Sequence, residues 1–332
     1  MITLKDIAKE ADLSVTQVSR ALNGHEDVSE ETRKRVQTLA NTMGYVKNLA
    51  AHRLVTGTSN QIAFVVQGFK NKNNESEYNE FYDILNGIHQ FSSEKQYETV
   101  LYIIQSIQHS YIQFFKEKGI QNAILYGFDY DDPKLIELLN TNYNIVCIDI
   151  PVEGINKGCV VINNTYYSTL AVEALLNSGK QNIAIITGSH HASVSLEREA
   201  GYRIALQKKR IPIIEEYIVD ANFNQQIAYQ KTLKLLEQYP QIDGFFCISD
   251  YMALGCMEAI KNIGKIIPKD IAIIGFDDIP ITRYVAPKLS TISQNSYSKG
   301  FEAAKLIDAI KQSLSIDTTV ILNCELKIRA SI

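Results

Sequence analysis

Residues 3–23 read TLKDIAKEADLSVTQVSRALN and contain two short segments whose apolar residues recur at helical spacing. Thr3 is followed by Asp6, and Ser14 is followed by Gln17, so each segment begins with the pattern of a capping box. The connection between the segments is short enough to require a tight turn. This stretch therefore predicts two helices that cross at a steep angle, as in a helix-turn-helix.

The second segment has a polar outer face without acidic side chains. Residues 14–23 contain no Asp or Glu, although the first sixty residues hold seven of them beside eight Lys and Arg. A plain three-helix packing module does not require such a donor-rich face, whereas the reading of DNA bases does. Because the net charge of these sixty residues is only +1, the arrangement of side chains rather than bulk charge supports this prediction.

A third helix is expected between Ser29, a capping residue followed by acids, and Gly44, a C-cap glycine. From Gln61 onward, short β-branched runs alternate with amphipathic segments, which is typical of parallel α/β sheets. About 270 residues of this pattern exceed one comfortable domain. The predicted organisation is a helical head at 1–46, a hinge helix and linker at 47–60, and a core at 61–332 with lobes at about 61–161 and 162–292, the rest crossing between lobes.

The composition describes a globular chain with a sizeable core. The 332 residues are 45% hydrophobic and 21% charged, which excludes disordered and collagen-like classes. A net charge of −4 means that any affinity for nucleic acid is local. The charged opening MITLKDIAKE and the absence of long apolar runs predict no signal peptide and no membrane span. Five cysteines without a C-x-x-C motif are expected to be reduced thiols in a cytoplasmic protein.

Further motifs follow residues 3–23 in order: VSEETRKRVQTLANTMGYVKN, LAAHRL, GSHHASVSLEREAGYRIAL, SDYMALGCMEAI, IPKDIAIIGFDDIPITRYVAPKLSTISQ and ELKIRAS. Together they resemble the lactose-repressor/galactose-repressor family of bacterial transcription regulators. The resemblance implies an all-α helix-turn-helix head and an α/β core of two doubly wound parallel-sheet lobes, similar to periplasmic binding proteins. It also implies a sequence-specific regulator, a repressor, whose affinity for operator DNA is controlled by a small ligand between the lobes.

The resemblance assigns DNA contacts to the second helix of the head. Residues expected at base edges are Val15, Thr16 and Arg20, and those expected nearer the phosphates are Ser14, Gln17 and Asn23. The planar fork of Arg20 can pair bidentately with guanine, and Thr16 offers a methyl group to thymine. The alternative for Thr16 is an ordinary exposed helix residue.

The segment from Asn48 to Val55 resembles the family's hinge helix, which inserts a leucine into the minor groove from each subunit of a dimer. Leu54 occupies that position, and Asn48 and Ala51 are the other DNA contacts expected here. Alternatively, Leu54 packs on its own core domain. His52 stands where the family often has arginine or a small polar residue, so any phosphate contact there depends on pH.

Ligands of open parallel α/β sheets bind outside the carboxyl ends of the strands. The motif GFDD places Asp277 and Asp278 at such an end, where a carboxylate can accept hydrogen bonds from adjacent hydroxyls. The resemblance implies that Asp277 is the ligand-facing member and that Arg198 contacts the effector. A surface ion pair is the alternative for Arg198.

The remaining residues expected at the effector site are Phe81, Tyr82, Phe223 and Asp250. Aromatic rings can stack on a sugar or a purine, although aromatic residues at such spacing are often part of a core. Two positions depart from the family pattern: Ser249 where asparagine is common, and Asn163 where aspartate is common. The default ligand is a sugar or sugar phosphate, but these departures leave the identity of the effector open.

The expected partners are pseudo-palindromic operator DNA, a small-molecule effector of carbohydrate type and a second copy of the chain, without a membrane. The ending after ELKIRAS leaves no room for a heptad tail, which predicts a dimer. A regulatory protein in place of the small molecule is one alternative. An extracytoplasmic sugar-binding protein is another, but the DNA-binding head and the opening sequence argue against it.

Enzyme classes lack their starting residues. The chain contains no G-x-G-x-x-G, G-x-x-x-x-G-K-[ST], H-E-x-x-H or G-x-S-x-G string. The adjacent His190 and His191 rarely both bind one metal, and neighbouring acids such as Asp277 and Asp278 usually point apart. We therefore expect no catalysis, no cofactor and no metal.

Overall fold

A computed structural model describes residues 2–22, 24, 27–45, 60–68, 76–104, 110–314 and 317–332, with the backbone alone for 76–79. The chain divides into two compact units, Met1–Ser59 and Asn60–Ile332. Each unit is described by itself below. Within the described residues, no helix is both long and apolar enough to cross a membrane.

The N-terminal unit consists, in its described part, of three helices around a small core. They are α1 (Leu4–Ala11), α2 (Val15–Leu22) and α3 (Glu30–Thr42). The three helices predicted from apolar spacing are thereby confirmed. Their buried apolar side chains are Ile7, Ala8, Val18, Ala21, Val36 and Ala40.

Capping interactions fix where α1 and α2 begin. The Thr3 backbone N–H donates to Asp6 Oδ2 over 2.8 Å, and the Ser14 backbone N–H donates to Gln17 Oε1 over 2.9 Å. The Gln17 N–H returns a 3.1 Å bond to Ser14 Oγ. Both predicted capping boxes are present, and between the two helices Asp12 adopts the left-handed conformation (φ 52°) that a tight turn requires.

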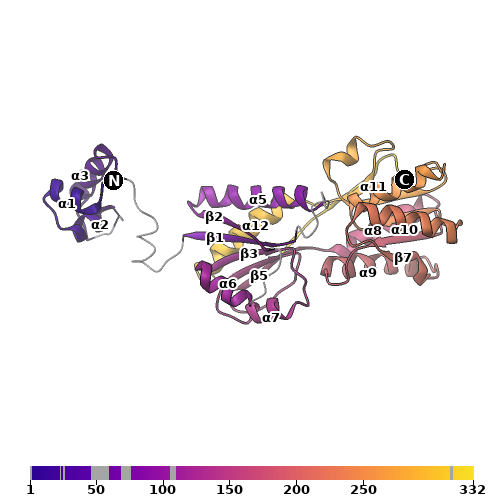
Figure 1. Ribbon diagram of the computed structural model, residues 1–332, viewed down its shortest axis with the longest axis horizontal. Coiled ribbons are helices and arrows are strands. Elements are labelled where there is room, and N and C mark those ends of the chain that lie inside the picture. Colours follow the sequence, from indigo (N-terminus) through magenta and orange to yellow (C-terminus); the bar gives the residue numbers. More distant parts are fainter. Residues whose placement is uncertain are drawn as a thin grey trace. The chain divides into compact units, whose positions relative to one another are not determined.

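The second unit contains two six-stranded sheets within the described residues (Figure 1). Sheet 1 has the order β11-β5-β4-β3-β1-β2, and sheet 2 has the order β12-β10-β9-β8-β6-β7. The strands of sheet 1 are β1 (Gln61–Gln67), β2 (Glu98–Ile104), β3 (Asn122–Tyr126), β4 (Asn144–Ile148), β5 (Lys157–Ile162) and β11 (Thr319–Leu322). The strands of sheet 2 are β6 (Ile183–Thr187), β7 (Ile218–Asp220), β8 (Gly244–Cys247), β9 (Ala272–Asp277), β10 (Ser290–Ser293) and β12 (Glu325–Lys327).

All strand pairings are parallel except that of β10 with β12. The expected core of two parallel α/β lobes is confirmed. Lobe 1 denotes sheet 1 with α5 (Ser76–Glu94), α6 (Tyr111–Lys118), α7 (Pro133–Leu139) and α12 (Ser296–Lys311). Lobe 2 denotes sheet 2 with α8 (Asn164–Asn177), α9 (Ser193–Lys208), η1 (Glu215–Tyr217), α10 (Gln225–Gln238), α11 (Asp250–Asn262) and η2 (Pro280–Arg283).

Helices cover both faces of sheet 1 because β1 is apolar on both sides. Phe64 packs with α5 and α12, and its neighbour Val65 packs with α6 and α7. Helices α5 and α12, which are far apart in sequence, lie side by side (Figure 1). A Cβ on Gly300 would collide with the Ile84 carbonyl, so this glycine permits the close approach of the two helices.

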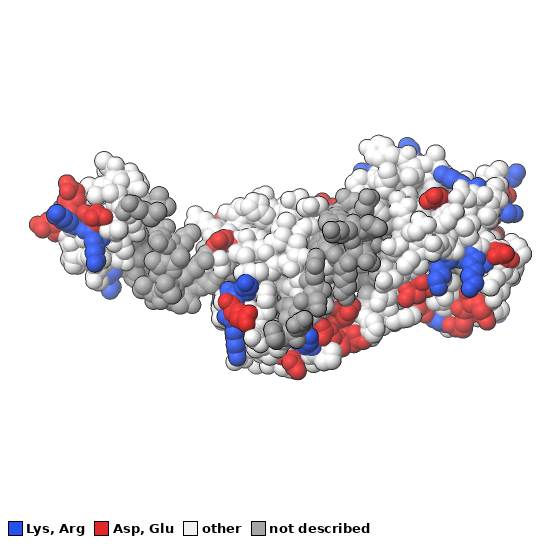
Figure 2. All heavy atoms as spheres, in the orientation of Figure 1, with Lys and Arg blue, Asp and Glu red and all other residues white. Residues whose placement is uncertain are grey.

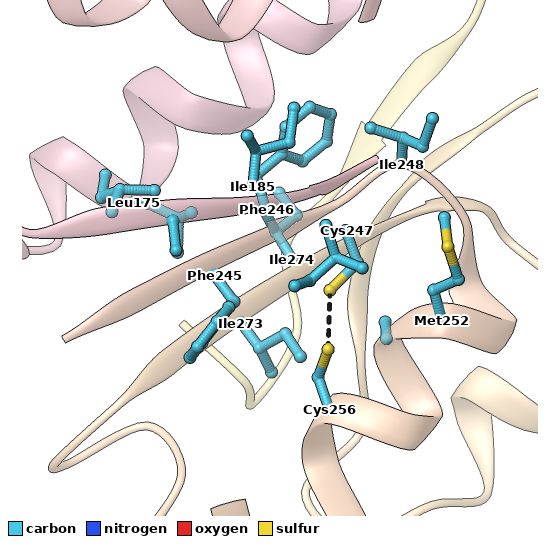
Figure 3. Close-up of a cluster of buried hydrophobic side chains, with 14 of the residues drawn as sticks. Leu175, Ile185, Phe245, Phe246, Cys247, Ile248, Met252, Cys256, Ile273 and Ile274 are labelled. Atoms are coloured by element: carbon cyan, nitrogen blue, oxygen red, sulfur yellow. Dashed lines mark hydrogen bonds between the residues drawn. The ribbon is translucent and has the colours of Figure 1, made fainter. Parts of the chain in front are cut away.

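The core of lobe 2 is formed by β-branched and aromatic side chains of its central strands (Figure 3). Cys247 and Cys256 belong to this core, and their Sγ atoms lie 3.4 Å apart without a disulfide. Of the five cysteines, all are free thiols and four are buried, as the sequence predicts.

Candidate functional site

The polar face of α2 is exposed. Ser14, Val15, Thr16, Gln17 and Arg20 all lie at the surface of the N-terminal unit, with Val15 at 40% exposure. The apolar side chain of Val15 is therefore exposed to water and would be buried only if a partner molecule covered this surface. The helix therefore presents a methyl-rich and donor-rich surface, with its opposite side packed on α1 and α3.

Arg20 is held by an acidic neighbour. Its guanidinium lies 2.7 Å from Asp27, and both side chains are about half exposed (46% and 54%). Such an exposed pair is weak, so it orients the arginine without preventing exchange for another acceptor. The visible face of this unit carries both acidic and basic side chains (Figure 2), in agreement with its small net charge. The expected DNA contacts Asn23, Asn48, Ala51 and Leu54 lie outside the described residues.

A cavity of about 430 Å³ lies in the second unit at the carboxyl ends of the central strands of both sheets. Its lobe 1 wall includes Gln67 at the end of β1, Tyr126 at the end of β3 and Asp149 after β4. Its lobe 2 wall includes Ser189 after β6, Ser249 after β8 and Asp277 at the end of β9. This is the location at which open α/β sheets bind ligands, and the volume suits a small molecule.

Arg198 of α9 is buried in the lobe 2 wall, with a side-chain exposure of 4%. Its Nε donates to Asn164 Oδ1 over 2.8 Å, and its Nη1 donates to the Ile248 carbonyl over 2.6 Å. The guanidinium lies 3.7 Å from the centre of the Phe276 ring, and Nη1 lies 3.6 Å from Asp277 Oδ1. This burial excludes the alternative of a surface ion pair and aims a fixed cation at the cavity.

Asp277 faces Arg198 from the end of β9. Gln294 Nε2 donates to its Oδ1 over 2.7 Å. Burial raises the pKa of Asp277 to about 7, against the lowering effect of Arg198. Its φ of 118° lies in a region that favours glycine, so the surrounding structure holds the backbone in a strained conformation. Such strain and such a pKa concentrate at functional sites.

The lobe 1 wall contains a buried cluster centred on Lys299. The Lys299 Nζ, fully buried, lies 3.0 Å from Glu80 Oε1 and 2.7 Å from Asp149 Oδ2. The Tyr126 hydroxyl donates to Glu80 Oε2 over 2.9 Å. Burial raises the pKa of both carboxyl groups. At Glu80 the Lys299 ammonium, the Tyr126 hydroxyl and Arg198 together outweigh burial, so the pKa of Glu80 lies below its ordinary value, whereas the pKa of Asp149 lies above its ordinary value.

The expected aromatic residues have different locations. Phe81 is buried (4% exposed) and stacks on Phe64 in the lobe 1 core, with ring centres 5.8 Å apart. Tyr82 is 54% exposed. Neither is among the described residues that line the cavity, whereas Phe223 is. A Cβ on Gly188 would collide with the Phe223 ring, so this glycine gives the ring its place in the wall.

Three other polar residues singled out in the sequence have structural partners. Asp250 is fully buried and accepts hydrogen bonds from Thr291 Oγ1 (2.7 Å) and the Ile279 N–H (3.0 Å). It supports the turn that follows Asp277 and is not part of the described cavity wall. Asp278 pairs with Arg283 and Arg329. Asn163 caps α8 by accepting from the Tyr166 N–H over 3.0 Å.

The sequence reasoning missed Glu80, Tyr126, Asp149 and Lys299. Tyr126 and Asp149 follow apolar strand sequences, so the rule that selected Asp277 could have found them. Glu80 adjoins Phe81 in the sequence, but the side chains of consecutive residues on a helix point about 100° apart. The choice of Phe81 therefore did not lead to Glu80. Lys299 lies in an amphipathic helix, where lysine is ordinarily solvated, and nothing local indicates its burial.

The comparisons with known proteins agree along the whole chain. Residues 3–48 match the model of bacterial regulatory proteins, lacI family, and residues 172–332 match that of a periplasmic binding protein-like domain. The chain is 31% identical over 333 residues to the probable HTH-type transcriptional repressor ExuR of Bacillus subtilis, covering 100% of this chain and 98% of the relative. It is 29% identical over 337 residues to the ribose operon repressor of Haemophilus influenzae, covering 100% and 99%.

Two solved structures resemble the whole chain. A complex of the transcriptional regulator CelR with cellobiose has a TM-score of 0.74 at 25% identity and covers 100% of both chains. The lac repressor dimer bound to operator and the anti-inducer ONPF has a TM-score of 0.84 at 22% identity, covers 99% and 98% and is similar in fold. The head, the two-lobed core and the DNA-binding regulator inferred from the sequence are confirmed, and the chain belongs to the lacI family of bacterial regulatory proteins.

Proposed function

We propose that the chain is a cytoplasmic repressor that binds pseudo-palindromic operator DNA as a homodimer. A carbohydrate that occupies the cavity between the lobes changes its operator affinity. The observation that carries this proposal is the cavity at the carboxyl ends of the central strands, where Arg198 and Asp277 face each other. Guanidinium and carboxylate groups provide the donors and acceptors that fix sugar hydroxyls.

The α2 surface supports the DNA-binding part of the proposal. Val15, Thr16 and Arg20 are exposed together on one short helix, as base-reading side chains must be. Ser14 and Gln17 lie at its N-terminus, where backbone N–H groups attract phosphate. In a dimer the two α2 helices read half-sites related by the protein's two-fold axis, so the operator is a pseudo-palindrome.

The open cavity favours a small ligand over a regulatory protein as the signal. A cleft closed by its own side chains would leave no space for a sugar, whereas about 430 Å³ remain here. Among the relatives and similar structures, the names include a ribose operon repressor and a complex with cellobiose. These names support a carbohydrate as the ligand class.

A two-stage experiment tests the proposal. The full chain selects its binding sites from random DNA, and a carbohydrate panel is screened for compounds that raise its melting temperature. We expect a pseudo-palindromic site and a sugar that changes operator Kd at least about fivefold. Arg20→Ala should relax base choice without changing sugar binding. Selection of no common sequence, or a stabilising sugar that leaves operator Kd unchanged, would contradict the proposal.

A further inference from the structure

The two walls of the cavity differ in their balance of charge. In lobe 2 the guanidinium of Arg198 faces the single carboxylate of Asp277. In lobe 1 the single ammonium of Lys299 serves two carboxylates, Glu80 and Asp149. All these groups are largely withdrawn from water, so solvent screens the difference poorly. The lobe 1 wall therefore has a carboxylate in excess.

Lys299 is not placed to receive an anion. Its side chain has no solvent exposure, and its Nζ donates to Glu80 Oε1 and Asp149 Oδ2. A phosphate or carboxylate of a ligand would have to displace one of these acids and leave that acid buried beside the incoming charge. The lysine thus acts as a fixed counter-ion within the wall.

Two acceptor oxygens in the lobe 1 wall lack a hydrogen-bond partner among the described residues. Asp149 Oδ1 and Gln67 Oε1 are buried without a hydrogen-bond partner, and both residues line the cavity. Each of these atoms accepts hydrogen bonds, and buried acceptors are ordinarily satisfied. The lobe 1 wall therefore has more acceptors than donors.

We infer that the Glu80–Lys299–Asp149 cluster forms a subsite for a hydroxyl or ammonium group, and that the cavity takes uncharged or amino sugars and rejects sugar acids and sugar phosphates. This inference rests on the proposed function and narrows its ligand class. The donor group of the ligand meets the carboxylates of this cluster, while Lys299 retains both of its carboxylate partners. A ligand ammonium would also balance the excess carboxylate, which a hydroxyl does not.

The test uses matched sugars with the full chain. Gluco, galacto, manno and ribo compounds are each supplied as the neutral sugar, the amino sugar, the sugar acid and the phosphate ester, and melting temperatures and calorimetric Kd values are measured. We expect stabilisation by a neutral or amino member and a Kd at least about tenfold weaker for its anionic counterparts. Asp149→Asn should reduce this discrimination and should weaken an amino sugar more than a neutral one.

Matched variants separate the subsite from general damage. Glu80→Gln provides a second removal of wall charge if Asp149→Asn does not fold, and Glu258→Gln removes an exposed acid of α11 as a control. A sugar acid or phosphate that binds as tightly as its neutral counterpart would overturn the subsite but leave the proposed function intact. If no member of the panel stabilises the chain, the proposed carbohydrate function itself falls. Unchanged discrimination in folded Asp149→Asn or Glu80→Gln protein would also overturn the subsite.

Discussion

The two lobes share a topology but support different chemistry at the same place in it. In each, the first strand lies between the second and the third, and the strands that follow extend the sheet in order. Both sheets aim the ends of their central strands at the cavity. Lobe 2 supplies its Arg198–Asp277 pair from α9 and β9, whereas lobe 1 depends on Lys299 from α12, a helix that comes after the lobe 2 strands β6 to β10 in sequence. The fold thus fixes where a ligand binds, and a few side chains decide which one.

The largest expected difference between the lobes is in stability. Lys299→Met leaves Glu80 and Asp149 buried without their cation, and breaking a buried pair in this way costs about 3 to 5 kcal/mol. The melting temperature should fall by roughly 5 to 10 °C, as measured by circular dichroism. The double variant Lys299→Met/Glu80→Gln removes one of the stranded charges and should recover part of the loss. Equal stability of parent and Lys299→Met would show that the cluster is not the ionic centre described here.

In lobe 2 the larger effect should be on binding. Asp277→Asn removes a carboxylate that accepts ligand hydrogen bonds worth about 1.5 to 3 kcal/mol each, so the stabilising sugar should bind at least about tenfold more weakly. Operator affinity without sugar should remain unchanged. Because the pKa of Asp277 is raised from 3.8 to about 7 in the folded chain, the cost of burying its charge builds up between these two pH values and is fully present at pH 8. The variant should therefore melt at or above the parental temperature at pH 8.

A different outcome would assign Asp277 to the framework instead. If Asp277→Asn lowers the melting temperature, sugar affinity and operator affinity together, its main role is to hold the strained turn after β9. Asp250→Asn gives the matching control, since Asp250 supports that turn from outside the cavity wall. Asp277 is assigned to the sugar site only if Asp277→Asn lowers sugar affinity alone, while Asp250→Asn does not.

These differences between the lobes also mark what could be predicted from the sequence. Strand periodicity, with the rule that ligands bind at strand ends, located the lobes and led to Asp277. The resemblance to the family added Arg198, which the cavity wall contains. Phe81 was misplaced because local sequence does not distinguish the core-facing position of α5 from the neighbouring cavity-facing Glu80. Lys299 needed the tertiary structure, because its burial results from the packing of α12 on α5.

A smaller effect should appear in the pH dependence of sugar binding. Asp277 is protonated below about pH 7, and a sugar that donates to its ionised form binds only after this proton has left the carboxyl group. Sugar affinity should therefore fall by about fivefold between pH 7 and pH 6. Glu80 of lobe 1 should contribute little to this fall in affinity, because its pKa lies below its ordinary value and its charge does not change in this pH range. Calorimetry at several pH values measures the slope, and Asp277→Asn should flatten it. A slope that persists in this variant would assign the proton to another group, with Asp149 the first to examine.

The smallest effect concerns the contacts that join the lobes at the cavity rim. His191 Nδ1 lies 2.8 Å from Asp131 Oδ2, but both side chains are substantially exposed (66% and 44%), so salt screens their attraction. His191→Gln should change sugar affinity by no more than about threefold, and the change should vanish at high salt. Ser193→Ala removes a 2.6 Å bond to the Asp149 carbonyl and should cost somewhat more, about fivefold, without salt dependence. If His191→Gln instead weakens sugar binding more than Ser193→Ala does, closure of the cleft depends mainly on the His191–Asp131 pair. Asp131 raises the pKa of His191, so the parental pair becomes charged as the pH falls. The loss of sugar affinity in His191→Gln should then grow at lower pH.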